Sequence, residues 1–285
     1  AQHNNEKPEL LWTFLAQIED LDIEKLKVDM NNPKIDKIIE SDAKDANALG
    51  VKGTPTIFVN EKKLNTLSHK ELFDLVETDY GIKAYNNSHI KNAFFFDLEG
   101  DMSAKKSVHG GRHPLPDIAM FINKLEAIGI SNDTKILVYD DDISVAARLW
   151  WMLKYIGITN VKILNGGINA AAQAGIEMES GEPNKSNHLK GKIDARINND
   201  LLIEMDELKT IISKGKNYIL IDSRSPERYK GLIEPYDKIP GRIPTSINIF
   251  FKDVMNENRI KEVEDLKKVY NNIDSDKMVI AYCGS

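Results

Sequence analysis

The sequence predicts an α/β protein in which two similar units each contain a parallel sheet. From about residue 79 onward, short apolar runs typical of buried strands alternate with amphipathic helical segments. Strands that alternate with helices in this way favour parallel sheets. Two stretches of this region also repeat the same order of motifs, which indicates an internal duplication. The part before residue 79 has a different pattern and is expected to form a separate module.

This first part reads as helices around a short strand pair. Pro8 begins one helical pattern, and Pro33 begins another that ends at Gly50. A β-rich run follows Pro55, and the polar residues 60–63 predict a turn after it.

The two later stretches show the same alternation on either side of a polar linker at 184–198. In the first stretch we expect strands at 93–97, 135–140 and 161–164, and helices at 116–128 and 145–155. In the second we expect strands at 218–222, 247–249 and 277–282, and helices at 205–213 and 263–271.

The repeat is clearest where a turn leads into an apolar strand. Asp133–Asp140 reads DTKILVYD, and Asp276–Cys283 reads DKMVIAYC. The two segments align so that Asp140 falls opposite Cys283. We therefore expect one copy to carry the chemistry and the other to serve as a scaffold.

The composition excludes several function classes. The net charge of −6 gives no broad basic surface for nucleic acid or anionic lipid. No apolar run approaches the length of a membrane span, and no signal peptide is visible. With one cysteine the chain forms no internal disulfide and no cysteine-rich metal site.

Cys283 is either a reactive thiol or a small buried hydrophobe. It ends an apolar run and is followed by Gly284 and Ser285, as when a buried strand delivers a nucleophile to a tight loop. Inward-pointing N–H groups in such a loop stabilise a thiolate, and glycine lets the backbone approach closely. We expect Cys283 to be the nucleophile and Gly284 and Ser285 to begin the cradle.

Several motifs in order make residues 79–285 resemble the two-domain rhodanese family, the thiosulfate and 3-mercaptopyruvate sulfurtransferases. The resemblance implies an inactive domain at 79–183 and a catalytic domain at 199–285 that stops within the active loop, after the cysteine. The motifs are SHIKNAFFFD at 88–97, AARLWWML at 146–153, LNGG at 164–167, IDSR at 221–224, RY at 228–229, GRIP at 241–244 and CGS at 283–285.

Residues 1–78 resemble part of a Dsb-type, thioredoxin-like disulfide oxidoreductase. The matching segments include Gly53–Asn60, which reads GTPTIFVN. In that family this segment lies beside a Cys-X-X-Cys motif, which is missing from this sequence. A function as a thiol–disulfide oxidoreductase would need a second cysteine, which the chain lacks. The two resemblances imply different cellular compartments. The resemblance to a Dsb-type protein implies a periplasmic location, whereas the resemblance to the mercaptopyruvate enzymes implies a cytoplasmic one.

Four charged residues accompany Cys283 as site candidates. Arg228 is expected to grip an anionic substrate, because a guanidinium holds carboxylate or thiosulfonate oxygens by two hydrogen bonds. Asp222, Arg224 and Arg242 are supporting candidates, with a structural ion pair, a cap or an exposed turn as the alternatives. In place of the second arginine usual in the mercaptopyruvate branch, the chain reads EPYD at 234–237.

Neither acidic nor histidine motifs predict a metal. Asp140–Asp142 reads as a solvated loop, and the glycines between His109 and His113 argue against a helical metal pair. Arg148 either pairs with one of these acids or lies at the boundary between the two domains.

The sequence therefore predicts a sulfurtransferase that needs no cofactor. A small anionic donor, 3-mercaptopyruvate or thiosulfate, would pass sulfane sulfur through a Cys283 persulfide to cyanide or a thiol. The alternative is a non-catalytic binding or adaptor protein on a thioredoxin-like and rhodanese scaffold.

Overall fold

The computed structural model divides into two units, Ala1–Leu67 and Ser68–Ser285. In the part of the chain that the structure describes, no helix is long and apolar enough to cross a membrane. The described residues are 22, 24, 25, 28, 33–48, 58, 59, 62, 63, 80–107, 111–181, 189–215, 217–237 and 239–283.

In the first unit, α3 spans Pro33–Ala48 and confirms the helix predicted after Asn32. Strands β1 (Phe58–Val59) and β2 (Lys62–Lys63) form an antiparallel pair, so the predicted turn is shorter than 60–63. The motifs at Pro8, Gly50 and Pro55 lie outside the described residues.

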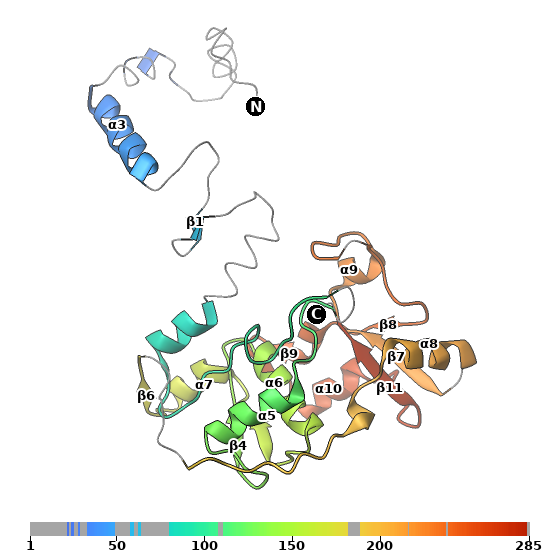
Figure 1. Cartoon of the computed structure of the whole chain (residues 1–285). Coiled ribbons are helices and arrows are strands. Elements are labelled where there is room, and N and C mark those ends of the chain that lie inside the picture. The colour runs from blue at the N-terminus through green and yellow to red at the C-terminus, as the bar shows by residue number, and fades with distance from the viewer. Residues whose placement is uncertain are drawn as a thin grey trace. The chain divides into compact units, whose positions relative to one another are not determined.

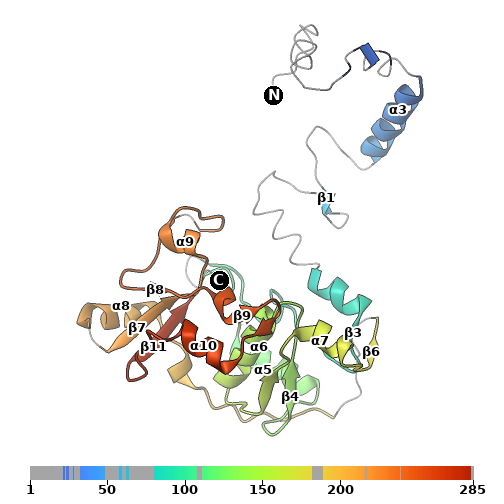
Figure 2. The same cartoon turned by 180° about the vertical axis from the view of Figure 1, so that it is seen from behind.

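The second unit begins with a half that we define as residues 80–181, which starts with helical residues 80–87 (Figure 1). Strand β3 (His89–Ile90) pairs antiparallel with β6 (Met178–Glu179), and Figure 2 shows this pair beside α7 (Gly167–Gln173). Strands β4 (Ile136–Val138) and β5 (Val161–Ile163) are parallel, as predicted. Helices α5 (Ile118–Ala127) and α6 (Ser144–Tyr155) complete this half.

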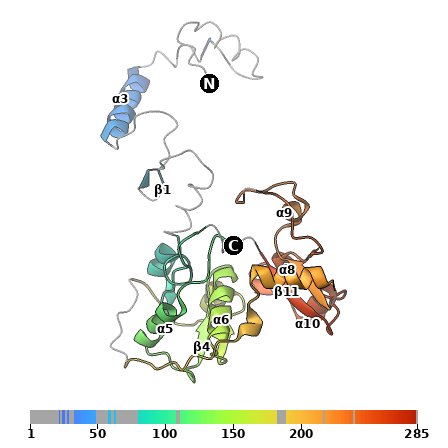
Figure 3. The same cartoon turned by 45° about the vertical axis from the view of Figure 1, so that its right-hand side comes forward.

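The core of the first half packs between these elements, and Figure 3 shows α6 against β4. Met152 and Leu153 of α6 are almost completely buried, as are Phe121 and Leu125 of α5. In α5, Phe121 and Leu125 lie four positions apart, and in α6 the buried Ala146 and Leu153 lie seven positions apart, so each pair lies on one face of its helix.

The strand predicted at 93–97 is wrong. Residues 93–97 are all described and form no strand. The Ala93 N–H donates to the Ile90 carbonyl at 2.9 Å in a turn, and the Tyr85 hydroxyl donates to the Ala93 carbonyl at 2.6 Å. The aromatic run packs rather than pairs, because Phe96 lies against the core.

The second half, residues 189–283, contains a three-stranded parallel sheet in the order β11-β7-β8. Strand β7 (Tyr218–Asp222) lies in the middle, between β11 (Met278–Tyr282) and β8 (Ile247–Asn248). The helices are α8 (Met205–Lys214), α9 (Pro226–Lys230) and α10 (Val263–Val269), with short 3₁₀ turns at Asn199–Leu201 and Phe251–Val254. In register, Tyr282 lies opposite Asp222, and Asp222 lies opposite Asn248. The carboxyl ends of all three strands therefore meet at one edge, where open α/β sheets bind ligands.

A hairpin of β9 (Met255–Asn256) and β10 (Arg259–Ile260) joins the second half to the first. The Ile260 N–H donates to Asn165 Oδ1 at 2.7 Å, and Asn258 Nδ2 donates to the Asp141 carbonyl at 3.0 Å. Gly167 is required by close approach, because a Cβ there would lie 2.2 Å from the Asp140 carbonyl oxygen. Within the LNGG motif, Asn165 therefore contacts the second half, while Gly167 packs inside the first.

Candidate active site

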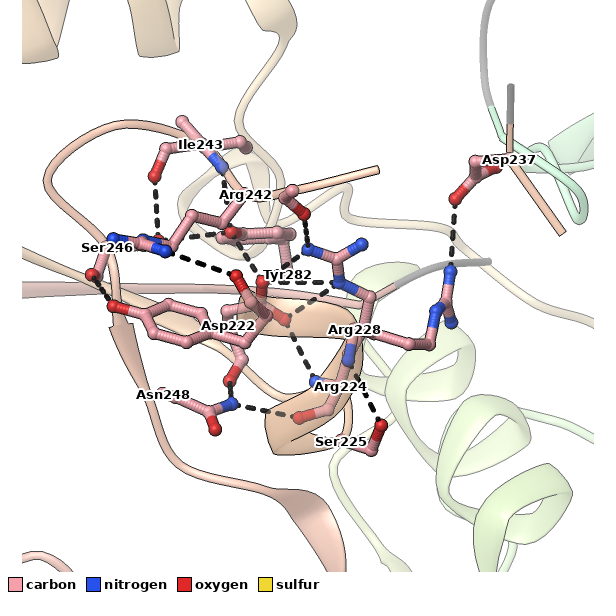
Figure 4. A network of polar contacts seen from close by, with 12 residues as sticks. Asp222, Arg224, Ser225, Arg228, Asp237, Arg242, Ile243, Ser246, Asn248 and Tyr282 are labelled. Carbon is pink, nitrogen blue, oxygen red and sulfur yellow. Dashed lines mark hydrogen bonds and ion pairs between the residues drawn. The ribbon is translucent and has the colours of Figure 1, made fainter. Parts of the chain in front are cut away.

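The candidate site is built around Asp222, the last residue of β7 and completely buried. Arg224 Nε donates to Asp222 Oδ1 at 3.0 Å, and Arg224 Nη2 donates to Oδ2 at 2.6 Å (Figure 4). The Tyr282 hydroxyl donates to the same Oδ2 at 2.7 Å. A buried carboxylate is costly unless it is paired and hydrogen-bonded, and here both conditions are met.

These contacts set the charge of Asp222. Burial alone would raise the pKa of Asp222, but the hydrogen bonds from Arg224 and Tyr282 outweigh it and hold this pKa below its usual value. The pKa of Arg224 is raised, chiefly by its hydrogen bonds to Asp222. Both groups are therefore charged at neutral pH, and their ion pair is the structural one that the sequence allowed.

Tyr282 fixes the end of β11 immediately before Cys283. Its hydroxyl accepts from the Ile243 N–H at 3.1 Å and lies 3.1 Å from Ser246 Oγ. Its carbonyl accepts from the Ser223 N–H at 2.9 Å. The backbone leading to the thiol is thus held by both the β7 end and the loop that carries the GRIP motif.

Arg228 lies in α9, a helix capped by Ser225 with Pro226 at its first position. Its guanidinium is largely buried, and Nη2 donates to Glu234 Oε1 at 2.8 Å and to Asp237 Oδ2 at 3.1 Å. The residue predicted to anchor the substrate is therefore already engaged by two carboxylates. Burial alone would raise the pKa of Glu234, but the hydrogen bonds from Arg228 and neighbouring backbone N–H groups hold it below its usual value.

Arg242 is exposed and contacts Tyr229. Its Nη1 donates to the Tyr229 carbonyl at 3.3 Å, and its guanidinium carbon lies 4.4 Å from the centroid of the Tyr229 ring. This geometry matches the exposed turn residue that the sequence offered as the alternative to a site role.

Cys283 is exposed and directly follows β11. Across the boundary, burial lowers the pKa of Arg148 in α6, while the nearby Cys283 and Glu99 raise it. Arg148 Nη2 donates to the carbonyls of Met102 at 2.7 Å and His113 at 2.9 Å, so it fixes the backbone at both residues. Of the two placements predicted for Arg148, the structure supports the boundary one. Gly284 and Ser285 lie outside the described residues.

No cluster of metal-binding side chains occurs among the residues that the structure describes. Asp140 instead caps α6 by accepting from the Ile143 and Ala146 N–H groups. His113 Nε2 lies 2.9 Å from Glu99 Oε1, and His109 is outside the described residues.

The lowered pKa values predict acid sensitivity of the second half. The pKa values of Asp222 and Glu234 in the folded protein lie below their values in the unfolded chain, which are about 4. The two carboxylates therefore contribute their full stabilisation above about pH 4 and lose it as the pH falls through the folded pKa values. Urea unfolding between pH 7 and pH 3 should show stability falling below about pH 4.

A matched control separates the buried carboxylates from surface charge. Asp265 also has a lowered pKa, because the side chain of Lys268 bonds it, but this pair is exposed. The Asp265→Asn variant should keep the acid transition, whereas Asp222→Asn should lower stability at neutral pH and flatten the transition. A profile of Asp222→Asn that matches wild type would contradict the assignment.

Comparison with known proteins places this geometry in a family. The model described as Rhodanese-like domain matches residues 60–174 and 204–285, and a thioredoxin model matches residues 2–78. The predicted divisions at 78/79 and 183/199 stay predictions.

Relatives with this fold include enzymes named for both predicted donors. A Pseudomonas aeruginosa protein named "Probable 3-mercaptopyruvate sulfurtransferase" is 35% identical, over 75% of this chain and 76% of its own length. The thiosulfate sulfurtransferase of Rattus norvegicus is 31% identical, over 70% of this chain and 68% of its own. The structure of 3-mercaptopyruvate sulfurtransferase from Leishmania major has a TM-score of 0.63 at 28% identity, covering 77% of this chain and 65% of that one. The chain therefore belongs to the rhodanese-like family, and its class of enzyme is the sulfurtransferases.

Proposed function

We propose that the chain carries a sulfane sulfur on Cys283 between a small anionic donor and a nucleophilic acceptor. The observation that supports this most directly is the exposed thiol at the carboxyl edge of a parallel sheet, on backbone held through Tyr282 by the buried Asp222–Arg224 pair. The donors would be 3-mercaptopyruvate or thiosulfate, and the acceptors cyanide or a small thiol.

In the first step the Cys283 thiolate attacks the sulfane sulfur of the donor. A sulfur–sulfur bond forms to Cys283 while the donor's bond to that sulfur breaks. The electron pair leaves with sulfite from thiosulfate, or with the enolate of pyruvate, which then takes a proton, from 3-mercaptopyruvate. The acceptor next attacks the outer sulfur and releases the thiolate, so cyanide becomes thiocyanate and no external oxidant is needed.

The surrounding residues hold and charge this site. The Asp222–Arg224–Tyr282 contacts fix the residue before the nucleophile. Arg148 places a half-buried positive charge within electrostatic reach of Cys283.

Steady-state turnover tests the proposal. Thiocyanate is measured with thiosulfate and cyanide, and pyruvate is measured with 3-mercaptopyruvate and a thiol. We expect turnover with at least one pair, with the parallel double-reciprocal lines of a two-step exchange. Absence of turnover with both pairs would favour the non-catalytic binding protein.

A further inference from the structure

The charges around Arg228 do not suit an anion by themselves. Arg224 and Arg228 face three carboxylates, those of Asp222, Glu234 and Asp237. The side chains of Asp222 and Glu234 are 0% and 4% exposed, so water screens them weakly. A donor anion brought to Arg228 would therefore meet a cluster with one net negative charge, and another cation is needed to hold it.

Arg112 supplies a cation from the first half of the unit. Its guanidinium carbon lies 4.2 Å from the centroid of the Tyr236 ring, and that of Arg228 lies 5.0 Å from the same centroid. The two guanidinium carbons are therefore at most about 9 Å apart. Tyr236 lies between Glu234 and Asp237 in the sequence. Because its ring contacts the guanidinium groups of Arg112 and Arg228, both arginines lie close to this acidic loop.

A hydrogen bond connects the residue after Arg112 to Arg148. The carbonyl of His113 accepts from Arg148 Nη2 at 2.9 Å. Burial holds the pKa of Arg148 below its usual value, and the charge of Cys283 opposes this effect from the other half. One peptide bond and one hydrogen bond thus connect Arg112 to a guanidinium within electrostatic reach of the thiol.

We infer that Arg112 is the second anion-binding group of the sulfur-donor site, held beside Arg228 by the Tyr236 ring. This inference rests on the proposed function and names the residue that selects its substrate class. The ligands are small anions whose carboxylate or sulfonate is bound by guanidinium groups from both halves while the sulfane sulfur faces Cys283.

Direct binding tests this role apart from sulfur transfer. In a Cys283→Ser background, calorimetry measures the Kd for thiosulfate and for 3-mercaptopyruvate with and without Arg112→Ala. Loss of one charge-assisted bidentate contact should weaken at least one donor by about 10- to 100-fold. Arg112→Lys keeps the charge but not the planar fork, so its Kd should fall between the two.

Arg196→Ala is the matched control, because it removes the same charge from an exposed side chain outside the cluster. Its Kd values should equal those of the parent, and thermal unfolding should show that Arg112→Ala is folded. An unchanged Kd in Arg112→Ala for both donors, or an equal loss in Arg196→Ala, would overturn the inference. Failure of the proposed function has a different signature. After treatment with either donor, the wild-type protein would then carry no additional sulfur on Cys283.

Discussion

Cys283→Ser is expected to abolish sulfur transfer, with turnover falling more than about 1000-fold for every donor and acceptor. A serine hydroxyl is almost fully protonated at neutral pH and forms no bond to sulfane sulfur equivalent to a persulfide. The chain has one cysteine, so no second thiol substitutes for it.

This variant should leave the fold intact. Cys283 is exposed and follows the last strand residue, so serine creates neither a cavity nor a buried polar group. Wild-type and variant proteins should unfold at the same urea concentration. A folded Cys283→Ser protein that retained half its turnover would show that another group performs the transfer.

Arg224→Ala is expected to destabilise the second half by about 3–5 kcal/mol, the usual effect of breaking a buried ion pair. The substitution leaves the carboxylate of Asp222, which is 0% exposed, without the guanidinium that donates to both its oxygens. It also removes the bond from Arg224 Nη2 to the Gly241 carbonyl at 2.5 Å. Urea unfolding followed by circular dichroism measures the change.

The paired variant Asp222→Asn with Arg224→Met provides the control. Removing both charges leaves no unpaired ion, so the double variant should lose less stability than the losses of Asp222→Asn and Arg224→Met added together. Additive losses, or an Arg224→Ala cost below about 1 kcal/mol, would contradict a structural role for the pair.

Much of the second half could be predicted from sequence. The segments at 218–222 and 277–282 are apolar runs bounded by polar turns, and the structure confirms β7 and β11 there. Strands β7 and β11 are parallel neighbours, so their carboxyl ends lie at the same edge of the sheet. The position of Asp222 beside the end of β11 therefore follows from the topology.

The missed elements are too short for periodicity to reveal. Helix α9 has five residues, and β9 and β10 have two each, so none repeats an apolar position often enough to be recognised. The run at 93–97 failed for the opposite reason. Its apolar residues satisfy the strand pattern, but burial of the Phe96 ring against the core explains an apolar run equally well.

The contact between Arg112 and Tyr236 could not be read from sequence. The two residues are more than a hundred positions apart, and only the folded chain brings guanidinium and ring together. The EPYD segment, which stands where the mercaptopyruvate branch usually has a second arginine, agrees with the role proposed for Arg112. Nothing in the sequence alone indicates which arginine would take that role.

Peptide mass spectrometry shows whether Cys283 itself receives the sulfur. The protein is treated with thiosulfate or 3-mercaptopyruvate and then digested with trypsin, which releases the cysteine in the peptide that begins at Met278. This peptide should gain one sulfur atom, cyanide should remove it, and the Cys283→Ser protein should never gain it. Thiocyanate formation without any sulfur on this peptide would show that Cys283 is not the sulfur carrier.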